Sequence, residues 1–229
     1  MDFGPADVSG QGASNILLTS VHITTSYSVL QVFLYTIEIE VIFMDKLPTP
    51  NHVIDIDLPK VAKSGLYFTI IPLVSLLVVH FILEQGIYFR LTFFTILWLL
   101  SGYIVLIILH EFFHLFGFRV FANVPWKSMK VGVNLKLGIA YATTDKLMTN
   151  RAIRKALLLP FWMTGILPAI IGLYIGSGIL IVLSALLIGG AAGDFAMYKQ
   201  LKELPDDWLI KDDPQLPRLY AFSPEQINP

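Results

Sequence analysis

Two histidines and a glutamate stand at a spacing that can bind and use a metal ion. Residues 110–114 read His-Glu-Phe-Phe-His. In this HExxH pattern two imidazoles one helical turn apart bind zinc, and the glutamate acts as general base. The alternative is a pair of histidines that only form hydrogen bonds between helices. However, the segment lies in the most apolar stretch of the chain, and a carboxylate between two imidazoles there needs a strong partner, of which a divalent cation is the simplest. We therefore expect His110 and His114 to be metal ligands and Glu111 to be catalytic.

The composition indicates the surroundings in which this chemistry would take place. The chain has 229 residues, of which 55% are hydrophobic and only 14% are charged, and its mean hydropathy is +0.68. These values are typical of a polytopic membrane protein, whose main partner is the lipid bilayer. The net charge of −1 argues against nucleic acid as a partner. The chain has no cysteine, so Zn²⁺ would have to be bound by histidine and carboxylate.

Four apolar segments are each close to the length of about 20 residues that crosses a bilayer. They cover about residues 65–83, 91–117, 156–175 and 178–198. The sequence therefore predicts a mainly α fold with about four transmembrane helices.

The connectors between these segments differ in charge, and this difference predicts the orientation. The long connector, residues 118–155, has one acidic residue, Asp145, and many basic ones: Arg119, Lys127, Lys130, Lys136, Lys146, Arg151, Arg154 and Lys155. The two short connectors together contain only one basic residue, Arg90. By the positive-inside rule the long connector is cytoplasmic, and an even number of spans then places both termini in the cytoplasm. We expect an integral protein of a bacterial cell membrane.

This topology singles out Asp194 as a third metal ligand. The second and fourth spans run in the same direction, and His110 lies about 28 Å along the second one. Asp194 stands at a similar depth in the fourth span and is the only acidic residue between Asp145 and Glu203. The small residues at 189–193 would permit close helix packing. The alternative is a carboxylate at a helix end that faces water.

The remaining segments suggest three domains: an N-terminal extension, residues 1–43, of doubtful role; a membrane domain, residues 44–198; and a polar cytoplasmic tail, residues 199–229. Partial apolar alternation at residues 129–144 predicts a small β-hairpin in the 118–155 connector. The edge of this hairpin could bind an extended substrate. The alternative is a hairpin with no role in substrate binding. The clustered acidic residues of the tail could bind a cation, but a solvated surface segment is the expected structure; they are Asp206, Asp207, Asp212 and Asp213. Candidate donors to a reaction oxyanion are Asn134, Asn150 and Arg151.

The sequence resembles a family of small bacterial membrane proteins described as zincin peptidases. The resemblance covers about residues 47–220, including HEFFHLFGF, the Leu-Leu-Leu-Pro segment that ends at Pro160, and GDFAMYKQLKELPDDWLIKDDP. It implies His110 and His114 as zinc ligands and Glu111 as the catalytic residue, and it matches Asp194 to a family aspartate. The architecture is similar to that of the site-2 proteases, which cut peptides in membranes. Those enzymes usually have an Asp-Gly pair, whereas this chain has the order Gly193-Asp194.

Three functions compete for this sequence. The first is a zinc-dependent membrane metalloprotease that hydrolyses a protein or peptide substrate, itself membrane-bound or not, near the cytoplasmic side. The second is a non-catalytic scaffold or regulator stabilised by its metal. The third is a metal or solute transporter, which is disfavoured because the cluster lies near one membrane edge and no repeated halves are visible. Glu111 separates the first two, because hydrolysis needs a base and a structural site does not.

Overall fold

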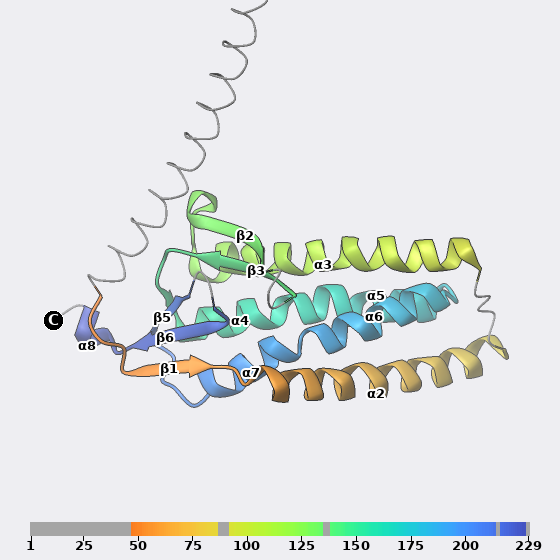
Figure 1. Ribbon diagram of the computed structural model, residues 1–229, viewed down its shortest axis with the longest axis horizontal. Helices are drawn as coiled ribbons and strands as arrows, with labels where there is room; N and C mark the ends of the chain where they lie inside the picture. The colour runs from red at the N-terminus through yellow and green to blue at the C-terminus, as the bar shows by residue number, and fades with distance from the viewer. Residues whose placement is uncertain (1–46, 87–91, 135–137, 214–215, 228–229) are drawn as a thin grey trace, which may run out of the picture. The chain divides into compact units, whose positions relative to one another are not determined.

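The computed structural model describes residues 47–227 except 87–91, 135–137 and 214–215. The predicted extension, residues 1–43, lies outside this range. The chain divides into two units, Met1–Pro48 and Thr49–Pro229, and every described helix and strand lies in the second. That unit is mainly helical and contains two small antiparallel sheets (Figure 1).

In the part of the chain that the structure describes, four helices are long and apolar enough to cross a membrane, which confirms the prediction of a mainly α fold with four such segments. The first is α2 (Leu58–Glu84) and the second is α3 (Phe93–Ala122). The third consists of α4 (Asn150–Pro160), the π-helical turn η2 (Phe161–Ile166) and α5 (Leu167–Tyr174). The fourth consists of α6 (Gly178–Gly190) and α7 (Ala192–Leu201).

Local signals explain why two of these helices, α2 and α4, begin earlier than the apolar segments do. Asp57 precedes α2, and its side chain accepts a hydrogen bond from the backbone N–H of Lys60 at 3.1 Å. Thr149 precedes α4 and accepts from the N–H of Ala152 at 3.4 Å. Such caps satisfy backbone donors that have no partner within the helix. The polar first turns of α2 and α4 are therefore helical although they are not apolar.

The four helices lie side by side, and successive ones run in opposite directions (Figure 1). The ends of α3 and α7 therefore lie at the same end of the bundle as the starts of α2 and α4. His110 lies about 26 Å along the axis of α3 from Phe93. The HExxH motif is thus close to the end of the bundle that carries both sheets.

Two glycines allow close contact between these helices. A Cβ atom at position 117 in α3 would lie 2.8 Å from the Cα atom of Ala156 in α4. A Cβ atom at position 189 in α6 would lie 2.9 Å from the backbone oxygen of Gly65 in α2. The close contact predicted for residues 189–193 therefore occurs against α2. Gly190 and Gly193 have open space where a side chain would be.

The two sheets confirm one prediction and correct another. The predicted hairpin is present as β2 (Met129–Asn134) paired with β3 (Ile139–Thr144), and it follows the 3-10 turn η1 (Trp126–Ser128). The second sheet has four strands in the order β1-β6-β5-β4. Its strands are β1 (His52–Asp55), β4 (Met148–Thr149), β5 (Leu209–Asp212) and β6 (Arg218–Phe222), and the short helix α8 (Pro224–Ile227) follows.

The expectation of a solvated polar tail is wrong for the strands β5 and β6, whereas Asp206 and Asp207 are exposed. Ile210, Leu219, Ala221 and Phe222 are buried, and the first three belong to one hydrophobic core with Phe118 and Leu201. Strands β5 and β6 pair antiparallel with each other, while β6 also pairs with β1 and β5 also pairs with β4. The tail is therefore part of the folded unit that surrounds the end of α3.

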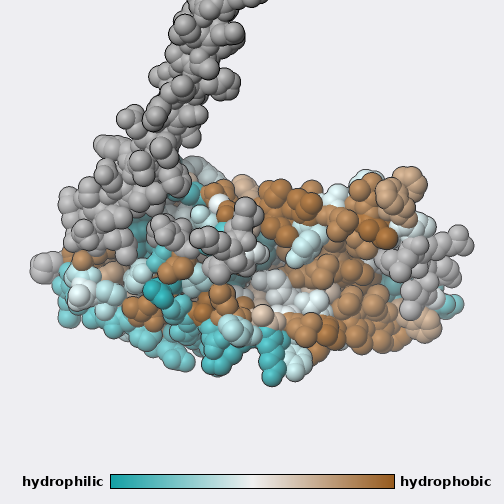
Figure 2. All heavy atoms as spheres, viewed as in Figure 1, coloured by the Kyte–Doolittle hydropathy of each residue, from teal (hydrophilic) through white to brown (hydrophobic). Residues whose placement is uncertain are grey.

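The surface of the molecule is divided along the length of the bundle. Figure 2 shows hydrophobic residues over the helices and hydrophilic residues over the end that carries the sheets. Most large side chains of α2 and α3 are exposed, among them Ile71, Ile82, Phe93 and Trp98. Such a continuous apolar surface is typical of contact with a membrane.

Candidate metal centre

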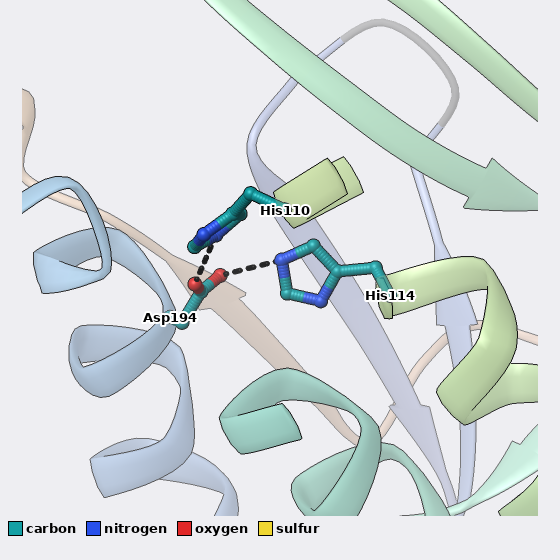
Figure 3. A group of neighbouring side chains, drawn as sticks. All are labelled: His110, His114 and Asp194. Atoms are coloured by element: carbon teal, nitrogen blue, oxygen red, sulfur yellow. Dashed lines mark hydrogen bonds and ion pairs between the residues drawn. The ribbon is translucent and has the colours of Figure 1, made fainter. Parts of the chain in front are cut away.

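His110 and His114 project from the same face of α3 and meet Asp194 from the first turn of α7 (Figure 3). The Nε2 atom of His110 lies 3.2 Å from Asp194 Oδ2, and that of His114 lies 3.4 Å from Asp194 Oδ1. Both histidines are buried. The fourth helical segment breaks at Ala191, so that Asp194 lies at the start of a new helix, where partial positive charge favours a carboxylate. The structure thus brings together the three residues that the sequence predicted as ligands.

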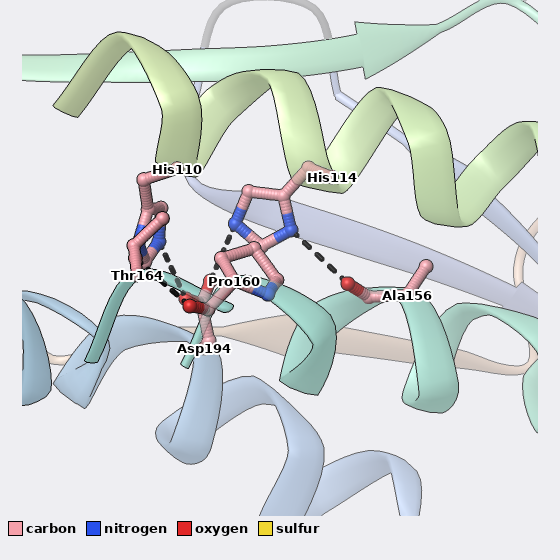
Figure 4. Close-up of polar contacts among 6 residues, drawn as sticks. All are labelled: His110, His114, Ala156, Pro160, Thr164 and Asp194. Atoms are coloured by element: carbon pink, nitrogen blue, oxygen red, sulfur yellow. Dashed lines mark hydrogen bonds and ion pairs between the residues drawn. The ribbon is translucent and has the colours of Figure 1, made fainter. Parts of the chain in front are cut away.

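The other ring nitrogens of the two histidines face acceptors on the third helical segment (Figure 4). His114 Nδ1 lies 3.3 Å from the backbone oxygen of Ala156, so this nitrogen must carry a hydrogen. His110 Nδ1 lies 3.2 Å from Thr164 Oγ1. The Thr164 hydroxyl donates its only hydrogen to the backbone oxygen of Pro160 at 2.8 Å, so it accepts from His110. In the neutral form, both imidazoles therefore carry their hydrogen on Nδ1 and present the Nε2 lone pair to Asp194.

Pro160 explains why the Ala156 carbonyl is available. In a regular helix that oxygen would accept a hydrogen bond from the N–H of residue 160, but proline has no N–H. The π-helical turn then begins at Phe161 and contains Thr164. Wide turns of this kind occur often at functional sites. One proline and one irregular turn thus supply the acceptors that orient both histidines.

This donor set fits a divalent metal such as zinc. Potential ligand atoms of His110, His114 and Asp194 all lie within 4.8 Å of one another. Two nitrogen lone pairs and a carboxylate face one another, and without a proton or a cation between them they would repel. Histidine and aspartate are common zinc ligands, and three protein ligands leave a fourth tetrahedral position for water. Hydrogen bonds from the far side of each histidine are typical of such sites.

A cavity of about 250 Å³ opens at these residues and also contains Glu111. Its walls come from α3, from α7, from strand β3 and from the end of β5. Gly190 and Gly193 line it, so the absence of their side chains leaves room above Asp194. Glu111 therefore lies where a base could act on a molecule beside the candidate metal ligands.

Asp212 also lines this cavity, and the sequence did not predict it beside His110, His114 and Asp194. It lies at the end of β5 and forms a side-chain hydrogen bond with Thr143 of β3. Burial raises the pKa of Asp212 to about 7, although the bond to Thr143 and the charge of Lys211 oppose this. Asp212 lies at the cavity because the tail folds back beside the hairpin. No local sequence pattern predicts this long-range packing.

The predicted oxyanion donors do not lie at this cavity. The Asn150 side-chain amide is buried and donates to the backbone oxygens of Leu201, Leu204 and Pro205, so it ties α4 to the end of α7. The prediction is therefore wrong for Asn150. Arg151 is exposed, and neither it nor Asn134 is among the residues that line the cavity.

One comparison with known proteins, a match to a family model, agrees with this geometry. Residues 103–209 match the family model described as "Putative zincin peptidase". The match covers slightly less than half of the chain, and it includes the HExxH motif, the hairpin, Pro160 and Asp194. It supports a zincin-like family and suggests a metallopeptidase, which in turn implies zinc. No curated protein and no solved structure matches the chain.

Proposed function

We propose that the protein is a zinc-dependent membrane peptidase that hydrolyses peptide bonds at the end of the helical bundle where the sheets lie. One observation carries the proposal. Two buried imidazoles, each with Nδ1 against a hydrogen-bond acceptor, direct Nε2 at one partly buried carboxylate, and Glu111 lines the same cavity. The match to the zincin peptidase model supports the same reading.

Each residue has a role in this proposal. His110, His114 and Asp194 would hold the zinc ion. When bound, zinc polarises a carbonyl group and lowers the pKa of water to about 7. Glu111 takes a proton from water on its carboxylate and returns it to the leaving amine. Thr164 and the Ala156 carbonyl keep the two imidazoles in the tautomer that can bind the metal.

The hairpin offers a way to present the substrate. Strand β3 lines the cavity through residues 139–142 and, among the described strands, pairs only with β2. A peptide in extended form could pair with its other edge, as in other cases of strand addition. An extended backbone exposes its carbonyl groups, whereas a helix hides them in hydrogen bonds.

The cavity would face the cytoplasm of a bacterial cell. The basic connector and the tail lie at the same end of the bundle as the HExxH motif. The positive-inside rule supports a cytoplasmic position for that end.

Metal analysis of the purified protein, combined with Glu111→Gln, tests the proposal. We expect about one zinc per chain in both proteins and cleavage of a protein substrate such as casein by the wild type only, because the substitution removes the base and leaves the ligands. Absence of zinc from the wild type would overturn the proposal. Bound zinc without cleavage in either protein would favour the metal-stabilised scaffold.

Asp194→Ala tests the third ligand in the same preparation. We expect weaker zinc binding, because only two protein ligands remain. Asp207→Ala is the matched control, since Asp207 is an exposed aspartate of the tail. Equal zinc affinity in wild type and Asp194→Ala would remove Asp194 from the site.

A further inference from the structure

A second and larger cavity lies on the other side of Glu111, between α3 and the hairpin. Its volume is about 550 Å³, within the range of about 300–1,000 Å³ that is usual for ligand pockets. Its lining is apolar except for Glu111. The other lining residues are Ile104, Ile107, Ile108, Phe112, Leu115, Val131, Gly132, Val133 and Ala140. We call it the apolar cavity.

The apolar cavity is built from one stripe of a helix and one face of a hairpin. The residues from α3 recur at intervals of three and four, so they share one side of the helix. Val131, Val133 and Ala140 lie on one face of the hairpin, because Val133 and Ala140 are partners in register and side chains alternate along a strand. Val131 and Val133 are 60% and 65% exposed, so this wall is open to an occupant.

The apolar cavity adjoins the cavity of the candidate metal centre, because the two share lining residues. Glu111 and Ala140 line both of them. On α3 the two histidines face Asp194, while Glu111 lies on the neighbouring side of the helix, toward the hairpin. A molecule that follows β3 past Ala140 would therefore have groups in both cavities at the same time.

We propose that the apolar cavity binds large apolar side chains of the peptide substrate next to the bond that is cut. This inference rests on the proposed function and adds a substrate class, namely peptides with bulky aliphatic or aromatic residues beside the scissile bond. In an extended peptide every second side chain points to the same side, so residues i and i+2 would share the cavity.

The carboxylate of Glu111 in the lining favours a peptide over a lipid chain as the occupant. A hydrocarbon chain would leave this carboxylate against apolar groups on one side, which is unfavourable for a polar group. A peptide supplies backbone N–H donors beside Glu111 and apolar side chains for the rest of the wall. The mixed lining thus complements a peptide.

Cleavage of matched peptides tests the proposal through specificity. In peptides that differ only next to the scissile bond, we expect Leu or Phe to give a higher kcat/KM than Ala by roughly tenfold or more. Val133→Trp and Ile108→Trp should reduce this ratio, because each fills part of the apolar cavity. Ile96→Trp is the control, as Ile96 is an exposed residue of α3 that does not line the cavity. Equal kcat/KM values for Leu and Ala peptides in the wild type would overturn the proposal.

Photo-crosslinking tests the same cavity without turnover. The probe is a peptide with benzoylphenylalanine at the apolar position, bound to protein from which metal has been removed with a chelator. Crosslinks at Val131, Val133 or Phe112 that a Leu peptide suppresses, and a Ser peptide does not, would support the proposal. Crosslinks spread evenly over α2, or a lipid that no peptide displaces, would contradict it. Specific crosslinks in a protein that cleaves no peptide would contradict the proposed peptidase function but not peptide binding in the apolar cavity. Cleavage with no preference between Leu and Ala peptides would contradict the role of the apolar cavity but not the peptidase function.

Discussion

At the scale of single residues, the candidate metal centre depends on polar groups behind the histidines as well as on the ligands themselves. His110 and His114 each need their hydrogen on Nδ1 to offer Nε2 to a metal. Thr164 and the Ala156 carbonyl fix this tautomer from a different helical segment. Residues that never touch the metal are therefore expected to control its affinity.

Thr164→Val should lower zinc affinity while the fold is retained. Valine has the shape of threonine but cannot accept the hydrogen of His110 Nδ1, and loss of such a partner typically costs about 10–100-fold in metal affinity. Competition with a chromogenic chelator measures the change. Thr69→Val is the control, because Thr69 has the same bond to a carbonyl four residues back but lies in α2. An unchanged affinity in Thr164→Val would show that His110 is oriented in another way.

Asp212 should make the stability of the metal-free protein depend on pH. Burial raises its pKa to about 7 in the folded state, from 3.8 in the unfolded chain. Between these values the unfolded state loses the proton first, so stability falls as pH rises from about 4 to 7. Asp212→Asn should therefore stabilise the metal-free protein by about 1–3 kcal/mol at pH 8 and have little effect at pH 4.

Thermal unfolding in detergent at the two pH values measures this effect. The metal-free form is required, because a bound cation would favour the ionised carboxylate. The exposed Asp207 provides the control Asp207→Asn. A stabilisation of Asp212→Asn that is the same at both pH values would contradict the explanation by burial.

At the scale of elements, irregularities in the helices place the functional groups. The break at Ala191 puts Asp194 into a first helical turn. Gly117 allows α4 to lie against α3, so that the Ala156 carbonyl reaches His114. Pro160 leaves that carbonyl without its helical partner. Each of these irregularities in an apolar helix therefore helps to position a group of the candidate site.

Pro160→Ala should weaken zinc binding although alanine favours helix formation. The new N–H at position 160 would compete with His114 for the Ala156 oxygen. Alanine would also no longer interrupt the regular helix before the π-helical turn that contains Thr164. We expect a loss of affinity of roughly tenfold, measured by chelator competition. Pro72→Ala in the interior of α2 is the control. Equal effects of the two substitutions would indicate a general change in helix packing.

At the scale of the whole molecule, the apolar helices and the polar sheet end define how the protein would sit in a membrane. The hydrophobic surface in Figure 2 covers the helices, and the hydrophilic surface covers the end with the HExxH motif. The candidate site would therefore lie near one membrane surface. Water could reach it there, and α3 is long and apolar enough to cross the bilayer as well.

Cysteine labelling in intact cells tests the orientation. The chain has no cysteine, so single substitutions report one position each. Lys127 is exposed at the end with the sheets, and Glu84 is exposed at the opposite end of α2. We expect a membrane-impermeant maleimide to label Glu84→Cys in intact cells and Lys127→Cys only after permeabilisation. The reverse pattern would place the candidate site outside the cytoplasm.

The sequence by itself determined the features that depend on local spacing and composition. The i and i+4 histidines, the four apolar segments and the alternating hairpin are recognisable because helix and strand periods are fixed by the backbone. Asp194 could be selected as well, since antiparallel spans relate depth to sequence position. Tertiary structure alone decided the parts that meet across long separations. Thr164 and Ala156 reach the histidines only because α4 packs on α3, and Asp212 reaches the cavity only because the tail folds into a sheet. Their contacts depend on packing between distant segments, for which no local pattern exists.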